Sequence, residues 1–340
     1  MYKELTKFIQ GYYQTNSFIP LHAPHFSGNE KKYLIETIDS TFVSSVGQYV
    51  EQLERQISDY TGAQAIATVN GSAALHAALY MADVRANDLV ITQSLTFVAT
   101  CNIIHMMNAE PIFVDVNKQS LSMCPVALES YLEEHAYLCV EGKARDKSTQ
   151  KIIKAVVPMH TFGHPAQLDE IAVICSKWSI ALVEDAAESL GSFYKGKHTG
   201  TLGDYGILSF NGNKIITTGG GGMVLCRNQA QSKETKHITT TAKVAHAYEF
   251  YHDQAAFNYR MPNLNAALGC AQMEMLTQFL TQKRSLAASY QQFFKNSDYK
   301  FVQEPEYAKS NYWLNAIICP NKSLRDELLE KTNQQGVMTR

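Results

Sequence analysis

An aspartate and a lysine each follow an apolar, strand-like run in the most informative stretch of this chain, residues 183–224. Asp185 comes after the run Ile180–Val183, and Lys214 comes after the run Ile207–Phe210 and before four consecutive glycines. Pyridoxal phosphate (PLP) chemistry requires this pair, because a desolvated lysine amine forms a Schiff base with the cofactor aldehyde. The carboxylate keeps the pyridine nitrogen protonated, so that the ring can accept electrons. These residues favour a PLP-dependent enzyme.

The phosphate of such a cofactor needs its own site. Asn70-Gly71-Ser72-Ala73 is typical of a strand that turns into a helix. Backbone N–H groups and the partial positive charge at a helix N-terminus bind phosphate, and Ser72 could add a hydroxyl donor. Taken alone, Ser72 would be read as an ordinary N-cap serine. Ser209 is a second candidate phosphate ligand, with a strand serine as the alternative.

Strand-length apolar runs alternate with helix-length amphipathic runs, which predicts an α/β fold with a mostly parallel sheet covered by helices on both faces. Such sheets bind ligands beyond the carboxyl ends of their strands. The charged segment Glu141–Lys151 predicts a solvated loop, and a helical pattern from Pro262 to about Lys295 predicts a bridge between domains. We therefore expect a large PLP-binding domain over residues 1–260 and a small C-terminal domain over residues 261–340. The predicted strands are 65–69, 89–92, 111–114, 152–158 and 180–184, and the predicted helices are 73–81, 96–107 and 168–177.

Composition excludes several classes of protein. The net charge is -2 and the charged residues are scattered. The sequence therefore has no basic patch that would indicate nucleic-acid binding. No apolar run is long enough to cross a membrane, and the N-terminus lacks the apolar core of a signal peptide. Seven dispersed cysteines without a C-x-x-C pair predict reduced thiols and a cytoplasmic location.

Two further motifs resemble a nucleotide-binding site and a metal site, but each lacks a feature that such a site needs. Gly191–His198 nearly matches a P-loop, but His198 replaces the Ser or Thr that binds magnesium, and the segment is more typical of a β-turn. His160 and His164 have a spacing seen in metal sites, but Gly163 and Pro165 break the helix that would aim both at one metal. We therefore predict neither nucleotide hydrolysis nor a metal site.

Six motifs span nearly the whole chain: NGSAALHAAL (70–79), TFVAT (96–100), PIFVDV (111–116), EDAAESLGS (184–192), SFNGNKIITTGGGGMV (209–224) and NYRMPNLNAALGCAQME (258–274). Together they resemble the DegT/DnrJ/EryC1/StrS family of PLP-dependent nucleotide-sugar aminotransferases. The resemblance implies PLP-dependent transferase fold type I, as in aspartate aminotransferase. EDAAE (184–188) and NGNKIITT (211–218) look most like the subgroup that acts on UDP-linked 4-keto-6-deoxy-N-acetylhexosamines. The N-terminal block within residues 19–54 is similar to 4-aminotransferases associated with legionaminic- and bacillosamine-type sugars.

The resemblance implies a role for each matching residue. Lys214 would form the Schiff base and shuttle protons, and Asp185 would pair with the pyridine nitrogen. Glu188 would lie near the ring oxygen, and Phe97 would stack on the ring, although it could equally be a core aromatic. Asn258 would reach the phosphate of a cofactor in the neighbouring subunit.

The phosphate ligands implied by the resemblance are the Gly71–Ala73 backbone, Ser72 and Ser209. Family members build each site at a dimer interface, so we expect a homodimer with shared active sites. The polar stretch Thr239–Tyr259 fits an arm that crosses to the partner.

The implied reaction moves an amino group from L-glutamate to C4 of a nucleotide-linked, UDP-type 4-keto-6-deoxy-N-acetylhexosamine. Three alternatives stay open: transfer to C3, a related dehydratase that has His where this chain has Lys214, and a non-catalytic PLP-binding regulatory protein. Family members continue past a T-R-P-x-W-like element, whereas this chain stops at Thr339-Arg340. We therefore expect an incomplete small domain with uncovered core surface.

Overall fold

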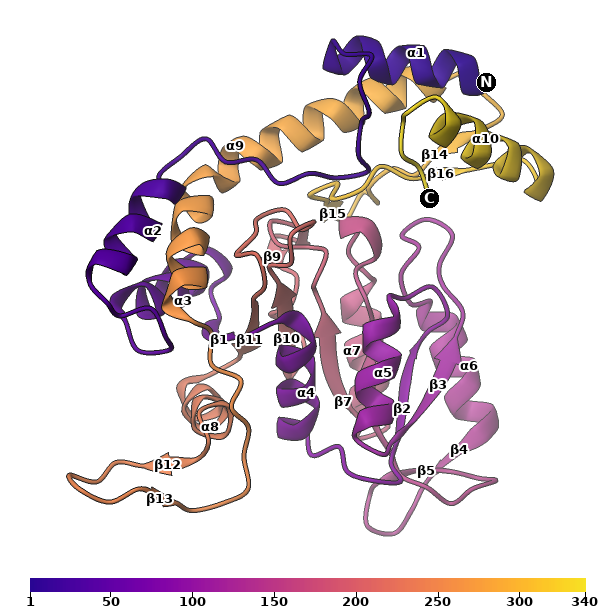
Figure 1. Cartoon of the computed structure of the whole chain (residues 1–340). Coiled ribbons are helices and arrows are strands. Elements are labelled where there is room, and N and C mark those ends of the chain that lie inside the picture. The colour runs from indigo at the N-terminus through magenta and orange to yellow at the C-terminus, as the bar shows by residue number, and fades with distance from the viewer.

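A seven-stranded sheet with the strand order β1-β11-β10-β7-β6-β2-β3 forms the centre of the molecule (Figure 1). The computed structural model describes all 340 residues. Neighbouring strands pair in parallel except at β11, which runs antiparallel to both β1 and β10. The predicted α/β class with a mostly parallel sheet is confirmed. The strands are β1 (Gln64–Thr68), β2 (Leu89–Gln93), β3 (Glu110–Val114), β6 (Ile153–Val157), β7 (Ala181–Asp185), β10 (Tyr205–Ser209) and β11 (Gly222–Cys226).

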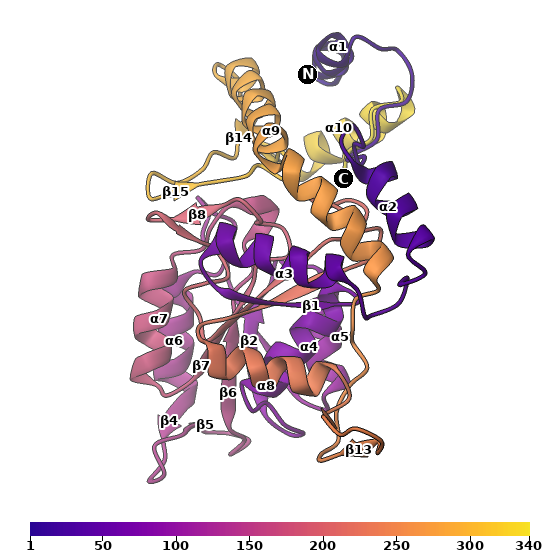
Figure 2. The same ribbon diagram turned by 90° about the vertical axis from the view of Figure 1, so that its left-hand side faces the viewer.

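Helices cover both faces of this sheet because successive strand side chains point to opposite faces. On β1, Ile66 packs with α4, α5 and α8, whereas Ala65 and Ala67 pack with α3 on the other face. Helices α6 and α7 cover the second face further along, over β2 and β6 (Figure 2). The helices are α3 (Gln48–Thr61), α4 (Gly71–Met81), α5 (Val98–Met106), α6 (Pro125–His135), α7 (Leu168–Lys177) and α8 (Gln229–Thr239).

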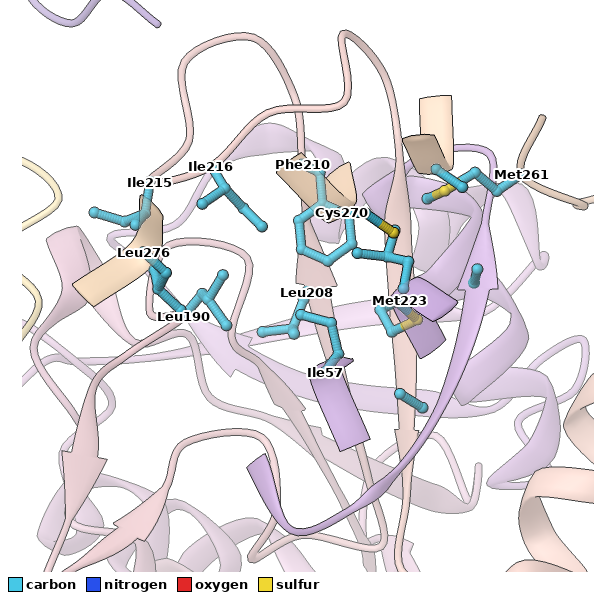
Figure 3. Packing of buried hydrophobic residues seen from close by; sticks show 14 of the residues in the cluster. Ile57, Leu190, Leu208, Phe210, Ile215, Ile216, Met223, Met261, Cys270 and Leu276 are labelled. Carbon is cyan, nitrogen blue, oxygen red and sulfur yellow. The ribbon is translucent and has the colours of Figure 1, made fainter. Parts of the chain in front are cut away.

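One core cluster anchors the segment that carries Lys214. Ile215 and Ile216 directly follow the lysine and are buried with Phe210 and Leu276 (Figure 3). Burying a side chain of this size stabilises the fold by about 1.5–3 kcal/mol. The two isoleucines therefore fix the backbone next to the lysine.

The 32-residue helix α9 (Asn263–Phe294) joins two hydrophobic cores (Figure 1). Its first half packs beside the sheet through Ala266 and Cys270, and its second half packs with α1 and α10 through Ala287 and Phe294. No helix, α9 included, has an apolar stretch long enough to cross a membrane. The domain boundary after residue 260 stays a prediction. The remaining outer elements are α1 (Tyr2–Tyr13), α2 (Glu30–Asp39), β14 (Lys300–Phe301), β15 (Ala308–Lys309), β16 (Ile317–Ile318) and α10 (Lys322–Gln334).

The charged segment 141–151 contains a strand, so the prediction of a loop throughout was wrong. Strand β5 (Ala144–Asp146) pairs antiparallel with β4 (Ala136–Leu138). The buried Asp146 carboxylate accepts hydrogen bonds from the backbone and hydroxyl groups of Ser148 and Thr149 at 2.7–3.1 Å. These local bonds turn the chain back on itself, which the charge pattern alone did not reveal.

The P-loop-like segment forms a hairpin. Strands β8 (Phe193–Tyr194) and β9 (Lys197–His198) pair antiparallel around Lys195 and Gly196, whose φ angles are 45° and 81°. Positive φ at both central positions is typical of a tight hairpin turn. The predicted β-turn is confirmed.

A second hairpin protrudes from the body of the molecule in both views (Figures 1 and 2). Its strands are β12 (Lys243–Val244) and β13 (Tyr251–His252). The side chains of Tyr248 and Phe250 are 91% and 82% exposed. Residues 243–252, here called the arm, therefore present aromatic surface that packs against little of their own chain.

Asn311 ties the segment after β15 to the loop that follows β7. Its Nδ2 donates to the carbonyls of Glu188 and Leu190 at 2.9 Å each, and its Oδ1 accepts from the Trp313 N–H at 2.8 Å. The Asn311 side chain is fully buried. Its side chain therefore links two segments that are far apart in the sequence through buried hydrogen bonds.

Replacing Asn311 with alanine should lower the free energy of unfolding by about 2–4 kcal/mol, because buried partners lose their hydrogen bonds. Urea denaturation gives this difference. Asn296→Ala, at an exposed position without side-chain hydrogen bonds, is the control and should change stability by less than about 0.5 kcal/mol. Equal stability of the two variants would contradict the linking role.

Candidate active site

Three predicted site residues lie at the carboxyl edge of the sheet. Asp185 ends β7, and its register partner on the parallel strand β10 is Ile207, two residues before Ser209. Gly71 begins α4 immediately after β1, and a Cβ at this glycine would lie 2.8 Å from the Ser209 Cβ. The strand ends therefore bring a carboxylate, a hydroxyl and a helix N-terminus to one edge, where α/β sheets bind ligands.

Lys214 lies in the loop between β10 and β11. Its backbone N–H donates to the Asn211 carbonyl at 3.0 Å, which closes a turn at the start of the loop. Its side chain is 12% exposed, with Nζ 3.6 Å from Glu188 Oε1 and 4.0 Å from the centroid of the Trp313 ring. The amine therefore lies between a buried carboxylate and an aromatic face.

This environment favours the neutral form of the lysine. Burial lowers the pKa of Lys214 below its ordinary value, and the negative charges of Glu188 and Asp185 only partly oppose that effect. Burial also raises the pKa of Glu188, against the nearby positive charge of Lys214. A neutral amine is the nucleophilic form of lysine, so the site is suited to attack on an aldehyde.

The Asp185 carboxylate is buried and held in one orientation. Its Oδ2 accepts a hydrogen bond from Thr100 Oγ1 at 2.8 Å, and its Oδ1 accepts from the Ala187 N–H at 3.2 Å. Each oxygen keeps a free lone pair. A fixed carboxylate with spare acceptor capacity suits a protonated ring nitrogen.

A buried pair of side chains, His160 and Glu184, supports the backbone beside Asp185. The Ala166 N–H donates to His160 Nδ1 at 3.1 Å, so the imidazole proton lies on Nε2, which donates to Glu184 Oε2 at 3.1 Å. Burial alone would raise the pKa of Glu184, but the hydrogen bonds from His160 and the backbone lower it. The backbones of the two segments are also hydrogen-bonded, since the His160 N–H donates to the Asp185 carbonyl at 3.1 Å. Glu184 accepts three more hydrogen bonds, from the N–H groups of Gly200, Leu202 and Gly203.

The N-terminus of α4 differs in one respect from the prediction. Asn70 is the N-cap, and its Oδ1 accepts from the Ala73 N–H at 2.7 Å, so Ala73 has no free N–H and Ser72 is not the cap. The N–H groups of Gly71 and Ser72 have no partner inside the helix. Together with Ser209 they form a cradle suited to a phosphate, without the Ala73 N–H.

The other two predicted residues form no side-chain hydrogen bond with this group. Phe97 is the N-cap of α5 and is 63% exposed, so it is not a core aromatic. Asn258 is exposed near the base of the arm, where its Oδ1 accepts from Arg260 Nε at 3.2 Å. No hydrogen bond or ion pair links Asn258 to Lys214 or Asp185. Their predicted contacts with the ring and with the partner's phosphate stay predictions.

Sequence reasoning missed two residues of the site. Thr100 lies in the quoted motif 96–100, but nothing in that motif indicates its hydrogen bond to Asp185. Trp313 comes from the C-terminal part of the chain, and its indole N–H donates to the Asn213 carbonyl at 2.6 Å. Its signal in the sequence is only that it is one of two tryptophans.

Glu188→Gln should lower the pKa of Lys214 further, because it removes a carboxylate that favours the charged amine. The amine then becomes neutral at lower pH. The rate at which cofactor-free protein captures added PLP, followed by absorbance over a pH series, should therefore rise at lower pH than in the wild type. Glu306→Gln, at an exposed carboxylate, should leave the profile unchanged. A profile for Glu188→Gln that is unchanged or displaced to higher pH would rule out this coupling.

Comparisons with known proteins agree with this geometry. The model of the DegT/DnrJ/EryC1/StrS aminotransferase family matches residues 24–340. EpsN of Bacillus subtilis, which carries the provisional name of a pyridoxal phosphate-dependent aminotransferase, is 36% identical over 326 residues, covering 95% of this chain and 80% of EpsN. GDP-perosamine synthase of Escherichia coli O157:H7 is 34% identical over 324 residues, covering 95% of this chain and 84% of the synthase.

Among solved structures, the aminotransferase TlmJ from Streptoalloteichus hindustanus has a TM-score of 0.86 at 24% identity, covering 95% of this chain and 84% of TlmJ. Helicobacter pylori PseC, an aminotransferase involved in the biosynthesis of pseudoaminic acid, has a TM-score of 0.83 at 21% identity, covering 94% of this chain and 83% of PseC. These two likenesses establish the fold. Together the comparisons confirm the predicted family, fold class, enzyme class and PLP cofactor. Because the family model matches nearly the whole chain and relatives above 30% identity cover most of it, the chain belongs to the DegT/DnrJ/EryC1/StrS aminotransferase family.

Proposed function

We propose that this protein transfers an amino group from L-glutamate to C4 of a nucleotide-linked 4-keto-6-deoxy sugar, in the biosynthesis of a surface polysaccharide or other glycan. The observation that carries the aminotransferase chemistry is the desolvated Lys214 amine at the sheet edge that also holds Asp185. Both residues stand at positions that match the motifs of the family.

Bound at this edge, PLP supplies an aldehyde that takes up the amino group and a ring that draws electrons from the reacting carbon. The Gly71 and Ser72 N–H groups and the Ser209 hydroxyl would bind its phosphate. Asp185, oriented by Thr100, would keep the ring nitrogen protonated.

Lys214 Nζ is the group that moves protons. It accepts a proton from Cα of the amino donor in the first half of the reaction and returns one to C4 of the sugar in the second. Burial lowers the pKa of Lys214 below its ordinary value, so the amine gives up its proton more readily than an exposed lysine does. Glu188 and Trp313 keep the amine in place between the two steps.

For the sugar we propose a UDP-linked 4-keto-6-deoxy-N-acetylhexosamine, on the resemblance of the EDAAE and NGNKIITT motifs to that subgroup. A GDP-linked 4-keto-6-deoxyhexose is the second candidate. It is favoured by the 34% identity to GDP-perosamine synthases of Escherichia coli O157:H7 and Vibrio cholerae.

The reaction can be tested in two halves. Adding L-glutamate alone to the PLP-loaded protein should replace the visible absorbance band by that of the pyridoxamine form, and L-alanine serves as the comparison donor. Adding a UDP- or GDP-linked 4-keto sugar should restore the band and yield an amino sugar detected by mass spectrometry. Greater turnover with the GDP sugar would replace the first candidate by the second. No band change with any amino acid and no amino sugar would overturn the proposal.

We further propose that the working unit is a homodimer in which each active site takes Asn258 from the partner. The protruding arm and the exposed Asn258 near its base support this arrangement. The aromatic side chains of Tyr248 and Phe250 would be buried against the second subunit.

Mixing Lys214→Ala protein with Asn258→Ala protein tests the shared site. If sites are shared, each mixed dimer has one site with both lesions and one intact site, so activity should return after subunit exchange. If each chain builds its own site, every site carries a lesion and no activity returns. Proven exchange without recovery, from two inactive parents, would exclude the shared site.

A further inference from the structure

Helix α9 carries a second half-buried lysine next to the candidate active site. Lys283 Nζ donates to the Trp313 carbonyl at 2.9 Å, and the ring of the same tryptophan lies 4.0 Å from Lys214 Nζ. Trp313 therefore contacts both amines. Unlike Lys214, Lys283 forms no ion pair with any carboxylate of the chain.

The charge of Lys283 is left without a counter-ion. Burial lowers the pKa of Lys283 to about 8, and no neighbouring charge contributes to the shift. The amine is still mainly protonated at neutral pH. An ammonium group has three donors, and the Trp313 carbonyl uses one of them. A desolvated charge without a counter-ion is costly to a fold, so an anion bound beside Lys283 would be stabilised.

A histidine without a hydrogen-bond partner at Nδ1 lies close enough to Lys283 and Lys214 for their charges to lower its pKa. His22 belongs to the coil between α1 and α2, and Gln272 of α9 bonds to this coil three residues further on, at His25. Its Nδ1 is buried without a hydrogen-bond partner. Burial, followed by the positive charges of Lys283 and Lys214, lowers the pKa of His22 to about 3. The imidazole is therefore neutral and can donate one N–H to an anion.

The coil that carries His22 is held in place. Gln272 of α9 donates through Nε2 to the His25 carbonyl at 2.9 Å and to Glu30 Oε1 at 2.7 Å. His22 and Lys283 therefore stand on two elements that hydrogen bonds connect, and the charge of Lys283 acts on His22.

We infer that Lys283 and His22 form a subsite for an anionic oxygen group of the substrate, beside Lys214. The inference rests on the proposed function, in which the amino donor carries carboxylates and the nucleotide sugar carries a diphosphate. The cofactor phosphate is a poorer occupant, because its proposed cradle is Gly71, Ser72 and Ser209, and no hydrogen bond links Lys283 to that cradle. Charge-assisted hydrogen bonds to such oxygens are roughly twice as strong as neutral ones.

Three variants of Lys283 test the subsite. Lys283→Met removes the charge and the donor, Lys283→Gln keeps a neutral donor for the Trp313 carbonyl, and Lys283→Arg keeps the charge. Lys295→Met, at an exposed lysine at the end of α9, is the matched control. For each protein the visible absorbance and its loss with borohydride report the bound cofactor. Absence of that band from the wild type would contradict the proposed function, separately from the subsite.

Binding of unreactive anions then tests the inference without turnover. The probes are glutarate, which has two carboxylates and no amine, and the nucleoside diphosphates UDP and GDP, each titrated by calorimetry into the PLP-loaded protein. Lys283→Met and Lys283→Gln should weaken at least one class of probe by about tenfold or more, whereas Lys283→Arg should bind within about threefold of the wild type. Lys295→Met should match the wild type.

The pattern identifies the occupant. Weakened glutarate binding alone assigns the subsite to the amino donor, and weakened nucleotide binding alone assigns it to the diphosphate. Unchanged affinities in Lys283→Met and Lys283→Gln, with the cofactor band intact, would overturn the inference. So would a wild type that binds none of the probes, or equal weakening in Lys295→Met.

Discussion

The burial of the Lys214 ammonium group is the constraint on which the rest of the site depends. Removing a charge from water favours its neutral form, and here one buried carboxylate and one aromatic ring are its immediate partners. The result is an amine that is both nucleophilic and able to exchange protons. The loop that carries Lys214 is fixed by the buried side chains of Ile215 and Ile216. Because both isoleucines belong to a core cluster beside the sheet, the position of Lys214 depends on that core.

The C-terminal part of the chain contributes to this environment through a few contacts. Trp313 covers Lys214 and Asn311 holds the loop of Glu188, so two neighbouring residues act on the amine and on its carboxylate partner. Trp313 also accepts the hydrogen bond from Lys283 on α9. Packing changes in this region should therefore affect the chemistry of a lysine almost 100 residues away in the sequence.

Local pattern was sufficient to predict most of the sheet. Each predicted strand overlaps an observed one, because a short apolar run bounded by turn residues is a local property of the sequence. The strand ends also predicted that Asp185 and Lys214 lie at one edge of the sheet. The charged segment 141–151 was mispredicted because Asp146 is satisfied by neighbours two and three residues away, so a buried carboxylate looked like a solvated one.

Contacts between distant segments could not be predicted in this way. The hydrogen bond from Thr100 to Asp185 and the contact of Trp313 with Lys214 both depend on how helices and loops pack. The loss of the Ala73 N–H as a phosphate donor depends on which residue caps α4, and the predicted alternative for the cap was Ser72 rather than Asn70. The unpaired charge of Lys283 is visible only after its surroundings are known.

The central claim is that Lys214 is the residue that binds the cofactor covalently. The most direct measurement is to reduce the PLP-loaded protein with borohydride, digest it and locate the modified peptide by mass spectrometry. The account predicts a single modified lysine, Lys214, and no modification in a Lys214→Ala variant. Modification of Lys283 or of any other lysine in the wild type, with Lys214 unmodified, would contradict it.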